Sequence, residues 1–218
     1  MSVLLPEPTP VATNGRELTR TTDSAFEVVT VDELKESMRL RTTAHDAVLG
    51  RLIKASRQQI ERMIEQALIK QIWQQTANRV PREIKLLVTP VLSVSSVEYI
   101  PGMDSDTWLT YDSSNYAAAG DSLLARTTWP THRNWKSLRV TFAVGYNDHP
   151  DSPTDDDKTT ARDAVPSSLR EAVRELAAHM FENPEGTAAV QYETVAKQFG
   201  ALPGVVKEII SGYIKWGL

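Results

Sequence analysis

The sequence predicts an α+β fold, mainly α: a small helical bundle, with a long central helix and C-terminal helices, that carries a β-rich insertion. Before residue 70 and after residue 165, apolar residues recur three and four positions apart, which is the period of amphipathic helices. Between them lie short β-branched or aromatic runs separated by turn residues. A chain of 218 residues can bury a sizeable core of this kind in one domain.

The N-terminal part predicts an arm followed by two helices. Residues 1–27 contain alternating prolines and many Ser and Thr residues without apolar periodicity, so we expect a flexible arm. Thr30 and Glu33 have the spacing of a capping box, which predicts a helix over residues 31–40. A longer helix is predicted over residues 44–67. Its apolar stripe consists of Val48, Leu49, Leu52, Ile53, Ile60, Met63, Ile64 and Ala67.

The β-rich insertion is expected over residues 70–146. Its clearest strand is the run from Leu138 to Val144, where apolar residues alternate with smaller or polar ones, as a half-buried strand requires. Gly145 then permits a turn out of the strand.

An acidic loop is expected over residues 147–163, because six aspartates and two prolines in this stretch resist burial. A calcium loop starting at Asp151 would need a ligand, a glycine and a glutamate at positions three, six and twelve, where the chain has Pro153, Asp156 and Arg162. We therefore interpret the segment as a solvated linker and expect no metal site.

Two helices are predicted to complete the chain. Pro166 suits a helix start and Asn183-Pro184 a helix end, which predicts a helix over residues 168–183. We expect residues 28–202, between the arm and the last helix, to form the main folded part of the chain. An apolar stripe after Pro203 predicts a last helix over residues 203–218, with Gly212 costing about 1 kcal/mol inside it.

Composition and motifs argue against an enzyme. There is no cysteine, and the four histidines are scattered over separate predicted elements. Phosphate-binding, nucleotide-binding, hydrolase and zinc-helix motifs are absent, so we expect no catalytic residue and no cofactor. No segment has the length and apolarity of a membrane span or a signal peptide, so we expect a protein of the cytosol without a membrane partner. The formal net charge of −4 disfavours non-specific DNA binding.

The order of several short motifs resembles the phage head-tail connector family of the gp6-like adaptors and the related gp8-like prophage proteins. The resemblance extends over about residues 28–218. The motifs that carry it are residues 30–35 (TVDELK), 46–64, 71–73 (QIW), 90–99 (PVLSVSSVEY), 140–146 (VTFAVGY), 165–170 (VPSSLR) and 178–183 (AHMFEN). The N-terminal arm, the acidic loop and residues 186–199 depart from the compact family pattern.

This resemblance implies a structural, non-enzymatic virion protein at the head-tail interface of a tailed phage, assembled in the host cytoplasm. It implies a homo-oligomeric ring, usually a dodecamer, below the portal protein. The ring would extend the channel through which DNA passes without sequence-specific binding, and would present a surface for the next tail or stopper protein.

The resemblance also implies roles for two sets of residues. The C-terminal helix generally engages the portal in such adaptors, and the corresponding positions here are Val205, Val206, Ile209, Ile210, Tyr213, Trp216 and Leu218. Because a ring needs a heterologous interface, the long helix is the first candidate for contacts between subunits. The charged residues proposed for those contacts are Arg51, Arg57, Glu61 and Glu65.

Three alternatives stay open. A small phage-encoded regulatory or DNA-binding protein could use the cations of the long helix, which are Arg51, Lys54, Arg57 and Arg62. A metal-dependent hydrolase could use the aspartates of residues 147–163. The apolar C-terminal helix, with Trp216 near its end, could equally pack on its own domain.

Overall fold

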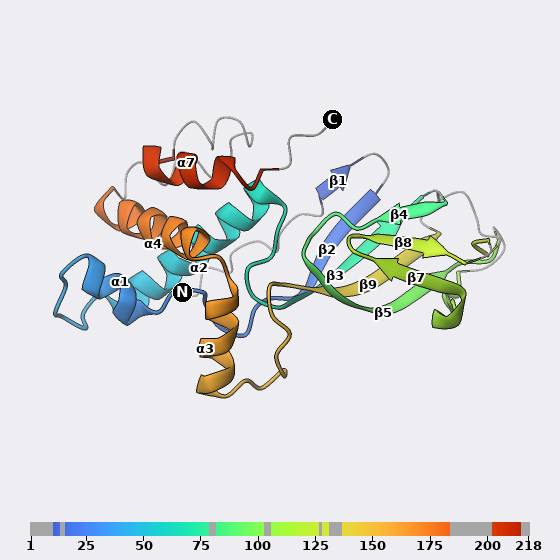
Figure 1. Ribbon diagram of the computed structural model, residues 1–218, viewed down its shortest axis with the longest axis horizontal. Helices are drawn as coiled ribbons and strands as arrows, with labels where there is room; N and C mark the ends of the chain where they lie inside the picture. Colours follow the sequence, from blue (N-terminus) through green and yellow to red (C-terminus); the bar gives the residue numbers. More distant parts are fainter. Residues whose placement is uncertain are drawn as a thin grey trace. The chain divides into compact units, whose positions relative to one another are not determined.

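The computed structural model describes residues 11–13, 16–78, 82–102, 106–126, 128–130, 137–183 and 202–214. The chain divides into two compact units. We call them the β unit, built from residues 1–24 and 70–145, and the helical unit, built from residues 25–69 and 146–218. The expected α+β fold is confirmed, and the insertion between the helices occupies almost the range in which the sequence placed it (Figure 1).

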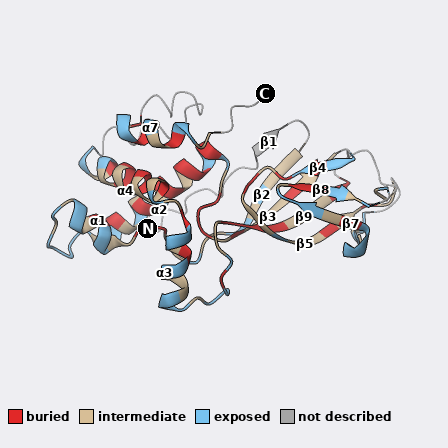
Figure 2. Cartoon of the chain, viewed as in Figure 1, coloured by how far each residue is buried: buried red, intermediate tan, exposed pale blue. Residues whose placement is uncertain are grey.

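The helical unit is held together by the long helix α2. Helix α4 packs against both α2 and α7, and α1 packs against α2. Figure 2 shows buried residues gathered where these helices face one another. The sequence placed the first three of these helices within a few residues of their observed bounds, which are α1 Val31–Ser37, α2 Asp46–Ile64 and α4 Ser167–Glu182. The last helix, α7, spans Gly204–Ser211 and ends before the predicted residue 218; residues 215–218 lie outside the described residues.

The capping box expected at the first helix is present. The Thr30 hydroxyl accepts a hydrogen bond from the Glu33 backbone N–H at 3.1 Å, and a Glu33 carboxylate oxygen accepts one from the Thr30 backbone N–H at 2.6 Å. These two bonds satisfy backbone donors that the first turn of a helix leaves without partners.

The β unit contains two antiparallel sheets. A six-stranded sheet has the order β1-β2-β3-β9-β5-β6, and a three-stranded sheet has the order β4-β8-β7. Strand β9 is central, and its residues Leu138, Val140, Phe142 and Val144 are buried, as their alternation predicts. The strands are β1 Val11–Thr13, β2 Arg16–Thr22, β3 Gln71–Ala77, β4 Glu83–Lys85, β5 Val91–Tyr99, β6 Leu109–Thr110, β7 Tyr116–Ala119, β8 Ser122–Ala125 and β9 Leu138–Val144.

The expectation of a flexible arm over residues 1–27 is wrong for residues 11–13 and 16–22, which form strands β1 and β2. Residues 16–22 form strand β2, which pairs with β3 from Arg16 opposite Ala77 to Thr22 opposite Ile72. The backbone hydrogen bonds of a sheet stabilise this polar segment, and its partner lies some fifty residues away in sequence, so no local pattern reveals it. Residues 1–10, also part of that expectation, lie outside the described residues.

The expectation of a loop throughout residues 147–163 is also wrong, because Asp155–Ala164 form helix α3. Its first turn carries three aspartates, which stabilise the positive end of the helix dipole. The Thr154 hydroxyl accepts from the Asp157 backbone N–H and the Asp157 carboxylate accepts from the Thr154 backbone N–H, which makes a second capping box. These hydrogen bonds hold the pKa of Asp157 below its usual range.

Candidate functional site

Helix α7 carries most of the residues proposed for portal binding, and the structure buries its apolar stripe within the helical unit. Val206 and Ile210 have no exposed surface and belong to the hydrophobic core, together with Leu169, Val173 and Leu176, among others. Ile209 and Tyr213 pack against the same core. In this chain, the stripe therefore already has a partner, which is α4.

The remaining portal candidates differ in their positions. Val205 lies on the outer side of α7 with 58% of its surface exposed. Tyr213 is half-buried, and its hydroxyl lies 2.8 Å from the hydroxyl of Ser168 in α4, so it links the end of α7 to its neighbour. Trp216 and Leu218 lie outside the described residues. Among the described candidates, Val205 offers the largest apolar surface to another protein.

The four charged residues proposed for subunit contacts fall into two pairs. Arg51 and Glu65 are exposed, on α2 and at its C-cap. Arg57 and Glu61, in contrast, are buried inside the helical unit, with Arg57 at 0% exposure and Glu61 at 8%. Because Arg57 and Glu61 are packed inside their own unit, the exposed Arg51 and Glu65 are better placed for subunit contacts, and the role of all four residues stays a prediction.

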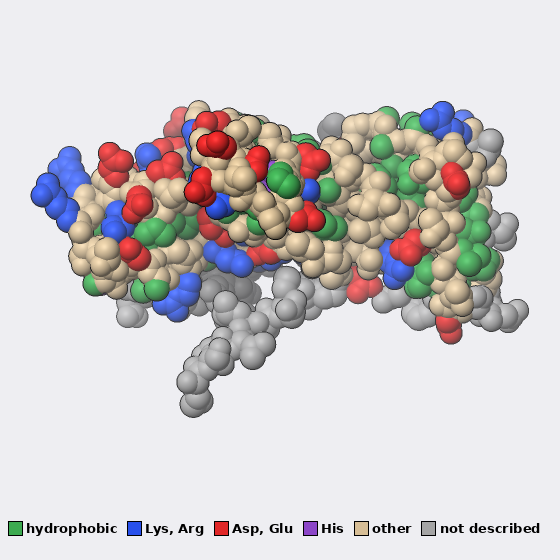
Figure 3. All heavy atoms as spheres, turned by 90° about the horizontal axis from the view of Figure 1, so that it is seen from below, with side chains coloured by type: hydrophobic (Ala, Val, Ile, Leu, Met, Phe, Trp, Pro, Cys, Tyr) green, Lys and Arg blue, Asp and Glu red, His purple; other side chains and the backbone are tan. Residues whose placement is uncertain are grey.

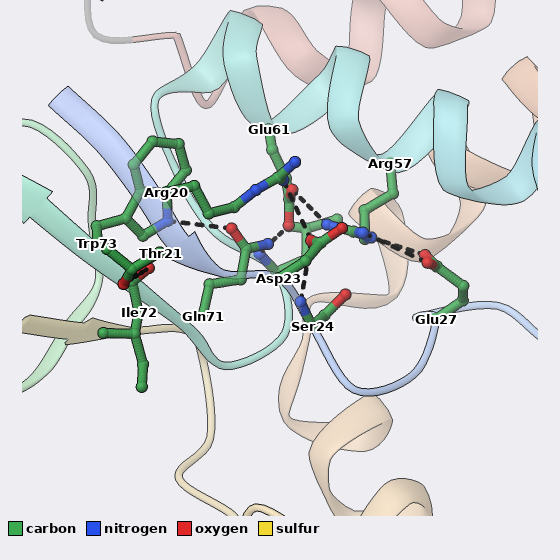
Figure 4. Close-up of polar contacts among 11 residues, drawn as sticks. Arg20, Thr21, Asp23, Ser24, Glu27, Arg57, Glu61, Gln71, Ile72 and Trp73 are labelled. Carbon is green, nitrogen blue, oxygen red and sulfur yellow. Dashed lines mark hydrogen bonds and ion pairs between the residues drawn. The ribbon is translucent and has the colours of Figure 1, made fainter. Parts of the chain in front are cut away.

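Arg57 forms a buried charge cluster with two carboxylates, which lie on either side of its guanidinium in Figure 4. Its Nε donates to Glu27 Oε2 at 2.7 Å, and its Nη1 donates to Glu61 Oε2 at 2.7 Å. The other oxygen of Glu61 accepts a hydrogen bond from the Leu68 backbone N–H at 2.9 Å. One guanidinium therefore connects α2 with the chain before α1 and, through Glu61, with the chain after α2.

Sequence reasoning missed this cluster although the sequence contains a signal for it. Arg57 follows Ile53 by four residues and precedes Ile60 by three, so it lies on the apolar stripe of α2. A charged residue at such a position is buried and needs an opposite charge beside it. Glu61, one turn later, supplies that charge.

The charges on one face of the molecule bear on the DNA-binding alternative. In Figure 3, charged side chains of both signs are interspersed on the face in view, without a broad basic region. Arg57, one of the four cations that motivated the DNA-binding alternative, is buried and paired. Arg51, Lys54 and Arg62 are exposed, which leaves a narrow basic stripe on α2.

The metal-dependent alternative was based on the aspartates of residues 147–163, and two of them, Asp155 and Asp157, make contacts within the first turns of α3. Asp157 caps the first turn, and Asp155 pairs with Lys158 at 2.8 Å, a contact that lowers the pKa of Asp155. Within the described ranges, no group of three or more His, Asp or Glu residues is placed to hold a metal ion. Nor is any helix in those ranges long and apolar enough to cross a membrane.

Comparison with protein families confirms the resemblance that the ordered motifs indicated. Residues 28–112 match the model of the family described as phage gp6-like head-tail connector protein. The match runs from the segment before α1 through α2 to the loop after β6, which is the first part of the range over which the sequence resembles this family. No curated protein matches the chain.

Comparison with solved structures extends the likeness to nearly the whole chain. A chain in the neck of an empty gene transfer agent (GTA) particle, computed with C6 symmetry, superposes with a TM-score of 0.68 at 21% identity. A chain in the virion of a native GTA particle gives 0.67 at 20%, and one in the neck of a native particle, computed with C12 symmetry, gives 0.63 at 18%. Each comparison covers 92% of this chain and 96% of the other. The chain thus has the fold of these particle proteins, and its N-terminal part matches the head-tail connector family.

Proposed function

We propose that this protein is a structural subunit of a head-tail connector in a tailed phage or a phage-like particle. In this role, copies of the chain form a ring below the portal protein, extend the channel for DNA, and provide the attachment surface for the next tail or stopper protein. The ring is expected to be a dodecamer that passes DNA without reading its sequence. The protein is then a virion component and not an enzyme.

The observation that carries the proposal is the agreement of two independent comparisons. The family match depends on the sequence of residues 28–112, whereas the fold comparison depends on the backbone over 92% of the chain. Both point to the junction between head and tail. The family is described as a head-tail connector, and two of the similar chains come from particle necks.

The same proposal includes portal binding through the C-terminal segment. Because the apolar stripe of α7 is buried, other residues of the segment must make the contact. Docking of the stripe itself would require α7 to leave α4 and expose Val206 and Ile210, which costs about 25 cal/mol for each Å² of apolar surface uncovered. Contact through the exposed Val205 needs no such opening. We therefore propose that Val205 makes the portal contact, together with Trp216 and Leu218, which lie outside the described residues.

The experiment that tests the proposal is reconstitution with the cognate portal protein. The two purified proteins are mixed and imaged by electron microscopy, and we expect a ring of this chain at one end of the portal ring. A chain that stays monomeric, and that does not sediment with the portal at any concentration tested, would contradict the proposal.

Two variants separate docking from folding. Truncation after Ile214 removes Trp216 and Leu218 but none of the described core, so we expect weakened portal binding at an unchanged melting temperature. The matched variant Val206→Ala removes buried surface from the same helix, so we expect a lower melting temperature with portal binding retained below it. If the truncated protein bound the portal normally and Val206→Ala lost binding, the portal contact would have to lie on another surface.

A further inference from the structure

Four aromatic side chains of the β unit contact one another on a surface that is partly open to solvent. The ring centroid of Tyr111 lies 6.3 Å from that of Tyr99, 6.2 Å from that of Tyr116 and 5.5 Å from that of Trp129. Tyr116 is 8% exposed, and the other three are half-buried. Leu109 is paired with Tyr99, so it lies on the same face of the sheet, and it is 42% exposed. We call these five residues the aromatic patch.

Hydrogen bonds hold two rings of the aromatic patch in place. The Tyr111 hydroxyl donates to the Thr128 carbonyl at 3.0 Å, and the Trp129 indole N–H donates to the Arg82 carbonyl at 3.2 Å. Both bonds use a polar atom at the edge of a ring, so the apolar ring faces remain for packing. Tyr and Trp side chains are enriched at the centre of protein contacts, and rings that are already fixed lose little entropy when a partner covers them. Figure 3 shows hydrophobic side chains gathered over the β unit on the face in view.

The chain itself contains a segment suited to such a surface. Residues 5–10 have the sequence Leu-Pro-Glu-Pro-Thr-Pro and lie outside the described residues. The proline ring fixes φ at about −65°, and the residue before a proline is restricted to extended conformations. The sequence of this segment therefore favours the polyproline II conformation at each position, and little backbone entropy is lost on binding. Proline-rich segments of this kind bind to surfaces made of aromatic side chains.

Opposite charges accompany the segment and the aromatic patch. Glu7 lies between two prolines, and Arg82, whose carbonyl holds an indole of the patch, has an exposed side chain. The nearby Asp112 is also exposed, but its carboxylate accepts the Ser114 backbone N–H at 2.8 Å. Glu7 can therefore face the Arg82 guanidinium. An exposed ion pair adds little affinity, but it favours one orientation of the bound segment.

The strand order of the six-stranded sheet argues for a neighbouring copy as the source of the segment. The segment precedes β1, an outermost strand, whereas Tyr99 lies on β5, four strand positions away. Four spacings of about 4.8 Å make about 19 Å along the sheet. Pro8 precedes Val11 by three residues and reaches about 9 Å from it at about 3.1 Å per residue. The central proline of the same copy therefore ends well short of the patch, measured along the sheet.

We propose that residues 5–10 of one copy bind to the aromatic patch of a neighbouring copy, with the proline rings packed against the rings of Tyr111 and Trp129. A segment that leaves one subunit and binds to a different surface of the next makes a heterologous contact, which is the kind that a closed ring needs. The neighbour is the next subunit of the proposed ring, so this inference rests on the proposed function. It adds a subunit contact that involves neither α2 nor α7.

Photo-cross-linking in the full chain tests the proposal. The photoreactive residue p-benzoylphenylalanine replaces Thr9, and chains that contain it are mixed with heavy-isotope-labelled chains that do not. We expect cross-links from position 9 to heavy-labelled peptides that contain Tyr99, Tyr111 or Trp129, identified by mass spectrometry. Such cross-links join two copies. Cross-links to light peptides alone, in the presence of excess heavy chain, would show binding within one copy and overturn the proposal, as would cross-links confined to other parts of the chain.

Two further comparisons test the chemistry of the contact. Replacing all three prolines of residues 5–10 by alanine should lower the cross-link yield several-fold at an unchanged melting temperature, because the described core is untouched. Trp129→Ala should also lower the yield. Trp108→Ala is its matched control, since the Trp108 ring lies 4.3 Å from the Arg139 guanidinium and is not part of the aromatic patch. An unchanged yield in the alanine-substituted segment would overturn the proposal, even if Trp129→Ala fails to fold.

The results also distinguish this inference from the proposed function. Cross-linking needs no portal protein. A chain that forms a ring on the portal without cross-links to the aromatic patch would overturn the contact and leave the proposed function standing. A chain that gives the expected cross-links between copies but never binds the portal would contradict the proposed function and support the contact.

Discussion

Replacement of Arg57 by methionine should be among the most damaging single substitutions in the helical unit. The guanidinium has no exposed surface, and it is the charge partner of Glu61, whose carboxylate is only 8% exposed. Methionine has a similar apolar stem, so the change mainly removes the charge. Removing one member of a buried ion pair costs about 3–5 kcal/mol, because the other charge stays buried without compensation.

The structure indicates which part of that range applies. Glu27, the second carboxylate of the cluster, keeps 24% of its side chain exposed and can turn toward water when Arg57 is absent. Glu61 has less freedom, because it also accepts the Leu68 backbone N–H. Because Glu27 can be hydrated and Glu61 keeps the hydrogen bond from Leu68, we expect the loss near the lower end of that range, at about 3 kcal/mol.

Urea denaturation followed by far-UV circular dichroism measures this loss, since the helical unit contributes most of the helical signal. Arg51→Met is the matched control, because Arg51 is exposed on the same helix and its Nε donates to the Ala47 carbonyl of that helix. The loss of stability in this variant should stay within about 0.5 kcal/mol. The double variant Arg57→Met with Glu61→Gln removes both charges and keeps an acceptor for Leu68, so it should be more stable than Arg57→Met alone. A single variant that costs under about 1 kcal/mol, or a double variant less stable than the single, would refute the buried charge cluster.

Three further predictions concern α7, α3 and DNA. Val206→Ala should lower the free energy of unfolding by about 2 kcal/mol, whereas the exposed Val205→Ala should change it by no more than about 0.5 kcal/mol. Equal losses of stability for the two variants in denaturation curves would contradict the packing of α7 on α4. The pKa of Asp157 is lowered in the fold by its hydrogen bonds with Thr154, so its contribution is present at neutral pH and is lost as the pH falls through the folded pKa. Hydrogen-exchange protection of residues 155–164 should therefore weaken on the acid side of the usual carboxyl range, and should lose this pH dependence in Asp157→Ala. Mobility shifts with duplex DNA should show no binding by the isolated chain even in low salt, and a steep salt-dependent affinity would revive the DNA-binding alternative.

The helices were predictable because their signals are local. Thr30 and Glu33 form a capping box within one helical turn, and the stripe of α2 recurs often enough to locate that helix within a few residues. The family resemblance rested on similar short motifs in a fixed order, and the family match confirms it over residues 28–112.

The features that the sequence did not predict depend on a partner strand distant in sequence, or on where charged residues lie within a helix. Strand β2 has no apolar alternation, and it exists because β3 lies beside it. The aspartates of residues 155–157 suggested a loop by composition, yet they lie in the first turn of α3, where negative charge is favourable. Arg57 and Glu61 resembled an exposed pair at one helical turn of separation, and only their place on the apolar stripe distinguishes them from one.

Helix α7 shows a different limit of prediction from sequence. Its apolar stripe predicted a helix correctly, but the stripe does not determine which surface covers it. An apolar stripe indicates that one face of a helix must be covered by another surface. The core of its own domain and a groove on a partner protein can both cover it. In this chain, α4 covers Val206 and Ile210, so these residues stabilise the subunit before assembly. A surface that is already used for folding is costly to use for binding, since the first contact must break before the second forms. At the exposed Val205, in contrast, binding and folding do not compete, so the proposed portal contact is first tested there.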